Sequence, residues 1–489
     1  MDPFLEHLNN PRNAEELSGA HATGEAGSMD CGALIRLFVR FDEERIGKAR
    51  FQAAGSGAAV ATGSYLSSMI EGLSWREAAA VAPSRVEAGL ASTTLPDVRD
   101  KLSTAAGIAI EALHAALEDA LRNGNFPHAG QKDEDSVLVA MSGGVDSSVA
   151  CLLEHRSGRR VIGVTMRLWS DPACAAPDSA GCCSPQAIRD ARAVCHSQGL
   201  PHLTIDLREE FENVVVDDFV REYQAGRTPN PCTRCNGSFR FPELARLAEI
   251  LGASRVATGH YARLARRGST PLLLRGVDSA KDQSYVLWDI EQRLLKNLEF
   301  PLGGMTKQET RRLAREASLP TQAREESQEV CFIPDNDHRR FLGDRVGGLP
   351  GEGDIVDEAG NRLGVHSGFI GYTIGQRRGL GISAPEPLYV LDIDPESNTV
   401  IAGGRDRLAV SMIEIDEVNF FSSLDEAESY SVQLRYNSVP VKGQVSPAAE
   451  GRLRLILSEA VYGVAPGQSA VIYAGDTVAA GGVIRVSEK

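Results

Sequence analysis

Two cysteines separated by two residues are the clearest chemical feature of this chain. Cys232 and Cys235 lie in the stretch GRTPNPCTRCNGSFRF, residues 226–241. A Cys-x-x-Cys pair can be half of a zinc site, a redox dithiol, or two thiols with separate roles in one reaction. The local sequence does not distinguish these three interpretations, so the rest of the chain must decide between them.

A second chemical signature is the segment SVLVAMSGGVDSSVACLLE, residues 136–154. It predicts a strand, a glycine-rich turn at Ser142–Gly144 and a helix. Backbone N–H groups in such a turn, together with the helix N-terminus, can bind a phosphate, and Asp146 could hold Mg²⁺ on a pyrophosphate. The segment lacks the Gly-Lys-Ser/Thr ending of a Walker A loop. An ordinary strand-to-helix turn with Ser and Asp caps is the alternative interpretation.

The elements around these residues predict an α/β multidomain protein. Residues 1–123 combine the alternating strand LIRLFVRF with a long helix, which favours an α+β domain, and residues 124–135 have the composition of a linker. Short apolar runs alternate with helices over 136–290, which is typical of a doubly wound parallel sheet. Residues 291–350 are expected to form a small helical region, and the Gly-punctuated strands of 351–489 predict one or two β-barrels.

The composition limits the classes of function. The chain has 489 residues, 42% apolar and 24% charged, as in soluble multidomain proteins. Its net charge of −15 argues against a general polyanion binder, so a nucleic-acid partner must meet a local basic surface. No membrane span and no signal peptide are recognised, which predicts a cytoplasmic protein without a membrane partner. Nine cysteines in such a chain indicate thiol chemistry or metal binding.

A series of motifs over residues 136–489 resembles one known family. The Ser-Gly-Gly-x-Asp-Ser loop is similar to the PP-loop of ATP pyrophosphatases, which cut ATP between its α and β phosphates. With GVTMRLW, GRTPNPCTRCNGSFRF, ATGHYARL, KDQSYVLW, ESQEVCFI, YTIGQRRGLGI and PGQSAVIYAGDTVAAGGVI, the chain resembles the tRNA-specific 2-thiouridylases, the MnmA family. The resemblance implies a sulfurtransferase that uses ATP and Mg²⁺. It would act on the wobble uridine U34 of Lys-, Glu- and Gln-type tRNAs, adenylating O2 and replacing that oxygen with sulfur supplied through a cysteine desulfurase.

The same resemblance implies a set of site residues. The ATP-binding positions are Ala140, Met141, Ser142, Gly143, Gly144, Val145, Asp146, Ser147, Met166 and Gly259. The positions facing the target base are Asn230, Pro231 and Cys232. The positions contacting tRNA are His260, Lys281, Asp282, Gln283, Arg435, Tyr436 and Gln468.

The resemblance also separates the roles of the cysteines. Cys331 is expected to carry a persulfide and Cys235 to attack it, releasing sulfide for the base or ending in a disulfide with Cys331. Cys232 departs from the family, in which many members have Asp at this position. Either Cys232 is a neighbour of this pair, or Cys232, Cys235 and Cys331 bind three irons of a [4Fe–4S] cluster.

Other readings of the cysteines are less well supported. A thioredoxin motif normally opens a helix in a much smaller domain, and a zinc site lacks a second pair of ligands with suitable spacing. The remaining thiols are expected to be structural; they are Cys151, Cys174, Cys182, Cys183 and Cys195.

Arginines supply the local basic surface that a tRNA would need. The set expected to contact phosphates consists of Arg227, Arg234, Arg240, Arg377 and Arg378. Taken singly, each of these side chains is better explained as solvated surface.

Residues 1–123 resemble the IscU/NifU-type iron–sulfur scaffolds, which hold a cluster on three cysteines and an Asp. Only Cys31 remains here, and one thiolate cannot hold a cluster unaided. Either this domain docks a cysteine desulfurase and Cys31 relays sulfur toward Cys331, or it is a structural, dimerising remnant. The other ligand positions are Ala33, Ser56 and Leu102, the last preceded by Lys101.

Two rival functions remain open at this point. A PP-loop ligase or thiolase acting on a small molecule would leave the GQRRGLG segment and the C-terminal barrel without a role. A sulfur or iron–sulfur carrier without ATP-dependent chemistry would leave Ser142–Ser147 without one.

Overall fold

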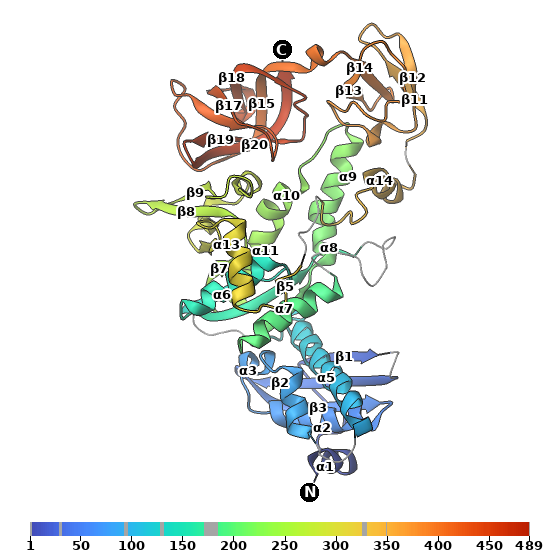
Figure 1. The fold of residues 1–489 in the computed structure, drawn as a ribbon, viewed down its shortest axis with the longest axis vertical. Helices are drawn as coiled ribbons and strands as arrows, with labels where there is room; N and C mark the ends of the chain where they lie inside the picture. The colour runs from blue at the N-terminus through green and yellow to red at the C-terminus, as the bar shows by residue number, and fades with distance from the viewer. Residues whose placement is uncertain are drawn as a thin grey trace.

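The computed structural model describes residues 2–28, 32–91, 96–127, 132–170, 184–324, 330–348 and 350–488. The molecule is elongated, with the N-terminal domain at one end, a parallel sheet in the middle and two β units at the other end (Figure 1). This arrangement confirms the predicted α/β multidomain class. Among the described residues, no helix has the length and apolar character needed to cross a membrane.

The N-terminal domain is a three-stranded antiparallel sheet covered by helices. Along β2 the side chains of Ile35, Leu37 and Val39 are buried, whereas Arg36 between them is exposed, as expected for a sheet with one packed face. Helices α2 and α5 pack on this sheet. The elements are α1 (Pro3–Asn9), β1 (Ala22–Ser28), β2 (Ala33–Asp42), β3 (Arg45–Ala54), α2 (Gly57–Ile70), α3 (Trp75–Ala79), α4 (Pro83–Leu90) and α5 (Pro96–Arg122).

The central sheet has five parallel strands in the order β10-β7-β4-β5-β6. Its strands and first helices are β4 (Asp133–Ala140), α6 (Val145–Arg156), β5 (Arg160–Arg167), α7 (Pro185–Ser197), β6 (His202–Asp206), α11 (Phe241–Ile250), β7 (Ala253–Ala257) and β10 (Leu298–Glu299). The segments around them are α8 (Arg208–Phe211), the π-helix η2 (Glu212–Val216), α9 (Asp217–Gln224), α10 (Pro231–Arg234), the π-helix η3 (Cys235–Arg240), α12 (Gln292–Leu295), α13 (Lys307–Glu316) and α14 (His338–Val346).

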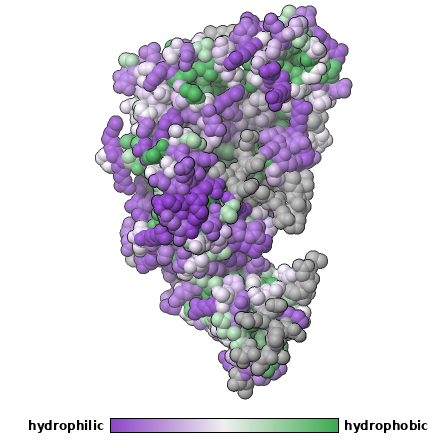
Figure 2. All heavy atoms as spheres, in the orientation of Figure 1, coloured by the Kyte–Doolittle hydropathy of each residue, from purple (hydrophilic) through white to green (hydrophobic). Residues whose placement is uncertain are grey.

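Both faces of this sheet are covered, which is why its strands read as continuous apolar runs. Val137 and Val139 belong to a core with residues of α6, α7 and α13, whereas Leu138 between them belongs to the core on the opposite face with residues of α11. The outer surface of α13 forms a strongly hydrophilic area in the middle of the molecule (Figure 2). Its inward residues include Lys307 and Thr310, which are buried.

The C-terminal part contains two β units. A four-stranded sheet has the order β12-β11-β14-β13, and a barrel is closed because β15 pairs with both β18 and β20. The hairpin β8–β9 extends the barrel sheet through the pair Thr477–Leu274, although it lies far earlier in the sequence. The strands are β8 (Ala262–Arg267), β9 (Thr270–Arg275), β11 (Gly353–Val356), β12 (Arg362–His366), β13 (Tyr389–Asp394), β14 (Thr399–Gly403), β15 (Ala409–Phe420), β16 (Tyr430–Gln433), β17 (Val441–Pro447), β18 (Leu453–Tyr462), β19 (Ser469–Ala474) and β20 (Thr477–Glu488).

The N-terminal domain is packed directly against the central sheet through α5 and β6. The ring of His114 on α5 lies 5.5 Å from that of His196 on α7 and 6.3 Å from that of His202 on β6 (centroid distances). Glu118 on α5 accepts a hydrogen bond of 2.8 Å from Arg167 on β5. Burial lowers the pKa of His196 to about 4 and also lowers the pKa of His114 and His202.

This histidine cluster predicts an acid-sensitive interface. A histidine with a lowered pKa stays neutral in the folded protein but binds a proton in the unfolded chain, so stability is present above about pH 6.5 and falls as the pH drops toward 4. For His196 alone we expect a loss of roughly 2 kcal/mol near pH 5. The melting temperature, measured from about pH 7.5 to pH 5, should fall less steeply in His196→Gln. His155→Gln, at an exposed position, is the control. Equal slopes in all three proteins would contradict the prediction.

Candidate active site

The glycine-rich turn after β4 has a defined, internally bonded shape. Ser147 Oγ accepts from Ser142 N at 3.1 Å and donates to Gly144 O at 3.1 Å. Gly143 has φ +72°, and a Cβ there would lie 2.3 Å from the carbonyl oxygen of Ala187 on α7. A side chain is therefore excluded at this position, and the turn approaches the neighbouring helix closely.

The ATP-binding positions predicted from the sequence come together at one edge of the sheet. Ala140, Met166 and Gly259 lie at or just beyond the carboxyl ends of β4, β5 and β7, which are neighbours in the sheet. A Cβ on Gly259 would lie 2.8 Å from the backbone of both Asp146 and Ser147. The predicted positions thus line the start of α6, the kind of place where parallel α/β proteins bind phosphates.

Asp146 already has a cationic partner in the structure. Lys307 Nζ lies 2.8 and 2.7 Å from the two Asp146 carboxylate oxygens, and Tyr261 Oη donates to the same carboxylate at 2.8 Å. Arg324 donates to Gly143 O at 3.1 Å and pairs with Asp190 at 2.7 Å. Two cationic side chains that the sequence analysis did not single out therefore lie beside the phosphate loop.

The cysteine segment forms a short helix that continues into a π-helical turn. Asn230 caps α10 by accepting from Thr233 N at 3.3 Å, and Pro231 is its first residue. Cys232 is exposed, whereas Cys235, the first residue of the π-helix η3, is buried. Single π-helical turns are uncommon and are frequent at functional sites.

The turn between β18 and β19 of the barrel holds this segment in place. Thr228 N donates to Pro466 O at 2.8 Å, and Gln468 Nε2 donates to the carbonyl oxygens of Thr228 and Pro229 at 2.9 and 3.1 Å. A Cβ on Gly467 would lie 2.9 Å from Thr228 O. Gln468, predicted to contact tRNA, therefore also has a bonding role within the chain.

Cys331 is half-buried and packs against the same apolar cluster that contains Cys235. Its neighbour Phe332 lies 6.0 Å from Phe211, which in turn lies 5.5 Å from Phe239 of the π-helix η3 (ring centroids). The two predicted catalytic cysteines thus belong to one packed region, although they are distant in the sequence.

The iron–sulfur alternative gains no support from the part of the chain that the structure describes. Among the described residues, no group of three or more His, Cys, Asp or Glu side chains is placed to hold a metal ion. Cys232 faces solvent while Cys235 lies inside the core. The cluster on Cys232, Cys235 and Cys331 therefore stays a prediction.

The positions predicted to contact tRNA differ in their surroundings. Arg435 and Tyr436 are exposed, and Lys281 and Gln283 are partly exposed. The Asp282 carboxylate accepts from Gly276 N, Ser284 N and Arg275 Nη1 at 2.9–3.0 Å, so it organises its own turn. His260 bonds Thr258 Oγ1 at 2.7 Å, and burial lowers its pKa to about 3, so its ring is neutral.

Two of the arginines expected to contact phosphates are paired with carboxylates. Arg227 donates to Glu222 at 2.7 Å, and Arg234 donates to Asp218 at 3.3 Å and to Glu417 at 2.9 Å. Arg377 and Arg378 are exposed in the segment after the 3₁₀ turn Phe369–Gly371. These two side chains are the better candidates for a phosphate surface.

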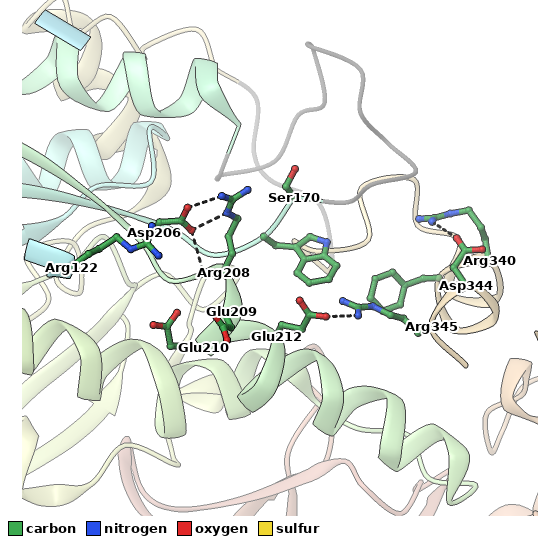
Figure 3. A pocket seen from close by; sticks show the side chains of 12 residues that line it. Arg122, Ser170, Asp206, Arg208, Glu209, Glu210, Glu212, Arg340, Asp344 and Arg345 are labelled. Carbon is green, nitrogen blue, oxygen red and sulfur yellow. Dashed lines mark hydrogen bonds and ion pairs between the residues drawn. The ribbon is translucent and has the colours of Figure 1, made fainter. Parts of the chain in front are cut away.

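A cavity of about 700 Å³ lies between the end of α5, the carboxyl ends of β5 and β6, and α14. Figure 3 shows three charge pairs among its side chains: Asp206 with Arg208, Glu212 with Arg345, and Asp344 with Arg340. The sequence analysis singled out none of its lining residues. Its aromatic wall includes Trp169, whose ring lies 6.4 Å from that of Phe332.

The described ligand positions of the N-terminal domain have structural roles. Ser56 caps α2 by accepting from Ala59 N at 3.3 Å, and Ala33 and Leu102 are buried in the core. Cys31 lies outside the described residues, as do Cys174, Cys182 and Cys183. The expectation that Cys151 and Cys195 pack in a core is confirmed, since both are fully buried.

A glycine-rich phosphate loop between adjacent parallel strands, with helices on both faces of the sheet, defines a nucleotide-binding α/β protein. Family models match the chain along most of its length. They are described as "NifU-like N terminal domain" over 1–122, "tRNA methyl transferase HUP domain" over 135–335, "tRNA methyl transferase PRC-barrel domain" over 339–404 and "Aminomethyltransferase beta-barrel domain" over 410–484.

The sequences of curated relatives identify the family within this class. The "Bifunctional protein NifU/MnmA" of Rubrobacter xylanophilus is 44% identical over 490 residues, covering 98% of this chain and 97% of that protein. The "tRNA-specific 2-thiouridylase MnmA" of Acidithiobacillus ferrooxidans is 46% identical, covering 73% of this chain and 99% of that protein. The protein of the same name from Geobacter metallireducens is 45% identical, covering 72% of this chain and 98% of that protein. The chain belongs to the MnmA family, in the form that carries a NifU-like N-terminal domain.

The contact between Gln468 and the cysteine segment can be tested directly. Gln468→Ala removes two hydrogen bonds to the Thr228 and Pro229 carbonyls, so we expect amide hydrogen exchange over residues 228–235 to accelerate about ten-fold without tRNA present. Gln444→Ala, at an exposed position on β17, is the matched control. Unchanged exchange in Gln468→Ala would limit this residue to a role in the tRNA complex.

Proposed function

We propose that the protein is a tRNA 2-thiouridylase that uses ATP to convert the wobble uridine U34 to 2-thiouridine. The observation that carries the proposal is the full-length match to a NifU/MnmA protein, on a chain whose phosphate loop and cysteine segment have the shapes described above. A small-molecule ligase gives no account of the barrel that holds the cysteine segment. A carrier without ATP-dependent chemistry leaves the phosphate loop without a role.

The first step activates the base. U34 O2 attacks the α-phosphorus of ATP, the bond from that phosphorus to the bridging oxygen breaks, and pyrophosphate leaves with the electron pair. The glycine turn and the N-terminus of α6 would bind the phosphates. The Lys307 ammonium group, which is paired with Asp146, would stabilise the negative charge that develops on the pyrophosphate leaving group.

Magnesium fits this site through Asp146, because Mg²⁺ is commonly held by one carboxylate together with substrate phosphates. When bound, it neutralises charge on the departing pyrophosphate. Lys307 and Tyr261 already fix the orientation of the Asp146 carboxylate. The sulfur step below uses no iron–sulfur cluster.

The second step transfers sulfur. Cys331 would carry the persulfide, and the Cys235 thiolate would attack its Sγ, which forms a Cys235–Cys331 disulfide and releases hydrosulfide. The hydrosulfide attacks C2, and AMP leaves with the former O2 oxygen. The two thiols are oxidised, the sulfane sulfur is reduced to sulfide, and an external dithiol must reduce the disulfide before the next turnover.

The remaining assignments are part of the same proposal. They are a cytoplasmic location, Lys-, Glu- and Gln-type tRNA substrates, a cysteine desulfurase as sulfur source and, for the N-terminal domain, either a sulfur relay through Cys31 or a structural role in a homodimer. The relay is better tested by Cys31→Ser than by deleting the domain, because α5 packs against β6.

The cysteine roles predict a separation between activation and sulfur transfer. In assays with tRNA, ATP, cysteine, a desulfurase and a reducing dithiol, Cys331→Ser should form no 2-thiouridine but still release pyrophosphate, the product of the activation step. Cys232→Ser should keep at least about half of the wild-type rate if Cys232 is only a neighbour of the pair. Nucleoside mass spectrometry measures the product. Unchanged thiolation in Cys331→Ser would overturn its assignment, and loss of thiolation in Cys232→Ser would favour the cluster.

The phosphate loop predicts a large effect of a single methyl group. Gly259→Ala places a Cβ 2.8 Å from the backbone of Asp146 and Ser147, so the start of α6 must move. We expect the Kd for ATP with Mg²⁺ to rise about ten-fold or more, measured by calorimetry. Gly304→Ala, where no atom lies within 4 Å of the added Cβ, is the matched control. An equal Kd in both variants would remove Gly259 from the ATP site.

A further inference from the structure

The segment that follows the Lys-Asp-Gln motif packs against the π-helical turn that begins at Cys235. Asn236 Nδ2 donates to Val286 O at 3.2 Å, and Ser238 Oγ lies 3.5 Å from Asp289 Oδ2. A Cβ on Gly237 would lie 2.2 Å from Asp289 Oδ2 and 2.5 Å from Asp289 Cβ. The Asp289 side chain therefore occupies the place that a residue-237 side chain would take.

Asp289 is itself fixed from the barrel. Asn419 Nδ2 on β15 donates to Trp288 O and Ile290 O, both at 2.8 Å, so it holds the carbonyl groups on either side of Asp289. A Cβ on Gly481 of β20 would lie 2.5 Å from the Trp288 ring. The barrel, the segment 286–290 and the π-helix η3 thus form one continuous contact.

The charges around Asp289 come from several elements. Burial raises the pKa of Asp289 to about 6, against the opposing charge of Arg234 on α10. Glu417 on β15 and the nearby Glu291 raise this pKa further, and Ser238 on η3 lowers it. Arg234 also donates a hydrogen bond to Asp218 on α9. The carboxyl group therefore gains its charge as the pH rises through about 6.

We propose that Asp289 is a positioning residue for sulfur transfer, because its side chain fixes the turn from which Cys235 attacks. This inference rests on the proposed role of Cys235 as the nucleophile. Attack on a sulfur–sulfur bond requires the thiolate to lie in line with that bond, and small displacements of a reacting group reduce rates strongly. Gly237 and Asp289 are complementary in shape, so a side chain added at position 237 requires the turn or the Asp289 side chain to move.

The test measures Cys235 directly, apart from turnover. Trypsin cleaves after Arg234, so Cys232 and Cys235 fall in different peptides and their alkylation by iodoacetamide can be followed separately by mass spectrometry. In Gly237→Ala we expect Cys235 alkylation and tRNA thiolation each to change about ten-fold or more, with single-turnover pyrophosphate release and tRNA affinity kept. Gly304→Ala is the control for adding a methyl group in open space.

A charge-specific variant keeps the proposal testable if Gly237→Ala does not fold. Asp289→Asn preserves the shape but removes the ionisation, so the pH profile of Cys235 alkylation should lose an inflection near pH 6 that wild type shows. Glu291→Gln, which changes an exposed carboxylate paired with Arg293, should keep that inflection. The double variant Gly237→Ala/Asp289→Gly should recover part of the loss in Gly237→Ala, since it vacates the space.

The outcomes separate this inference from the proposed function. Wild-type Cys235 alkylation and thiolation in both Gly237→Ala and Asp289→Asn would overturn the positioning role. If Cys235 alkylation responds to Asp289 while the wild-type protein forms no 2-thiouridine, the positioning of the thiol stands and the proposed reaction fails.

Discussion

The hydrogen bonds between the β18–β19 turn and the Thr228–Pro229 carbonyls set the geometry of the reactive segment. Helix α10 spans only Pro231–Arg234, and a single helical turn is not stable by itself. Its position comes from Pro466 and Gln468 of the barrel on one side and from the packing of η3 on the other. The barrel therefore holds the segment that carries Cys232 and Cys235, and its loss would release this segment rather than merely remove a binding surface.

The phosphate loop is enclosed in a comparable way by a distant segment. On α13, Lys307 pairs with Asp146 and Thr310 accepts a hydrogen bond from Tyr261. Further along the chain, Arg324 donates to the carbonyl oxygen of Gly143 in the phosphate loop. The Lys307 side chain is largely buried whereas that of Asp146 is 32% exposed, so removal of the Asp146 carboxylate would be costly mainly because it takes a counter-charge from a buried cation. Substrate phosphates and a divalent cation would offer both groups new partners. The resting ion pair keeps them ordered until then.

The sequence predicted the elements that have local signals. Short apolar runs between helices predicted four of the strands, β4, β5, β6 and β7. The glycine-rich turn between β4 and α6 predicted the phosphate loop. Contacts between distant segments left no such signal. Lys307 meets Asp146 from 161 residues away, and the hairpin β8–β9 joins a barrel formed by the last part of the chain. Arg227 and Arg234 were expected at phosphates, yet the carboxylates that pair with them could not be read from composition.

The packing of α5 against β6 makes the N-terminal domain a structural support of the central sheet. β6 is the last strand of the central sheet, and the histidines buried beside it belong to both partners. The longest helix of this domain, α5, shares a hydrophobic core with the central sheet. Removing the domain would therefore expose apolar surface of the central sheet to water, a cost in stability that does not depend on cluster chemistry.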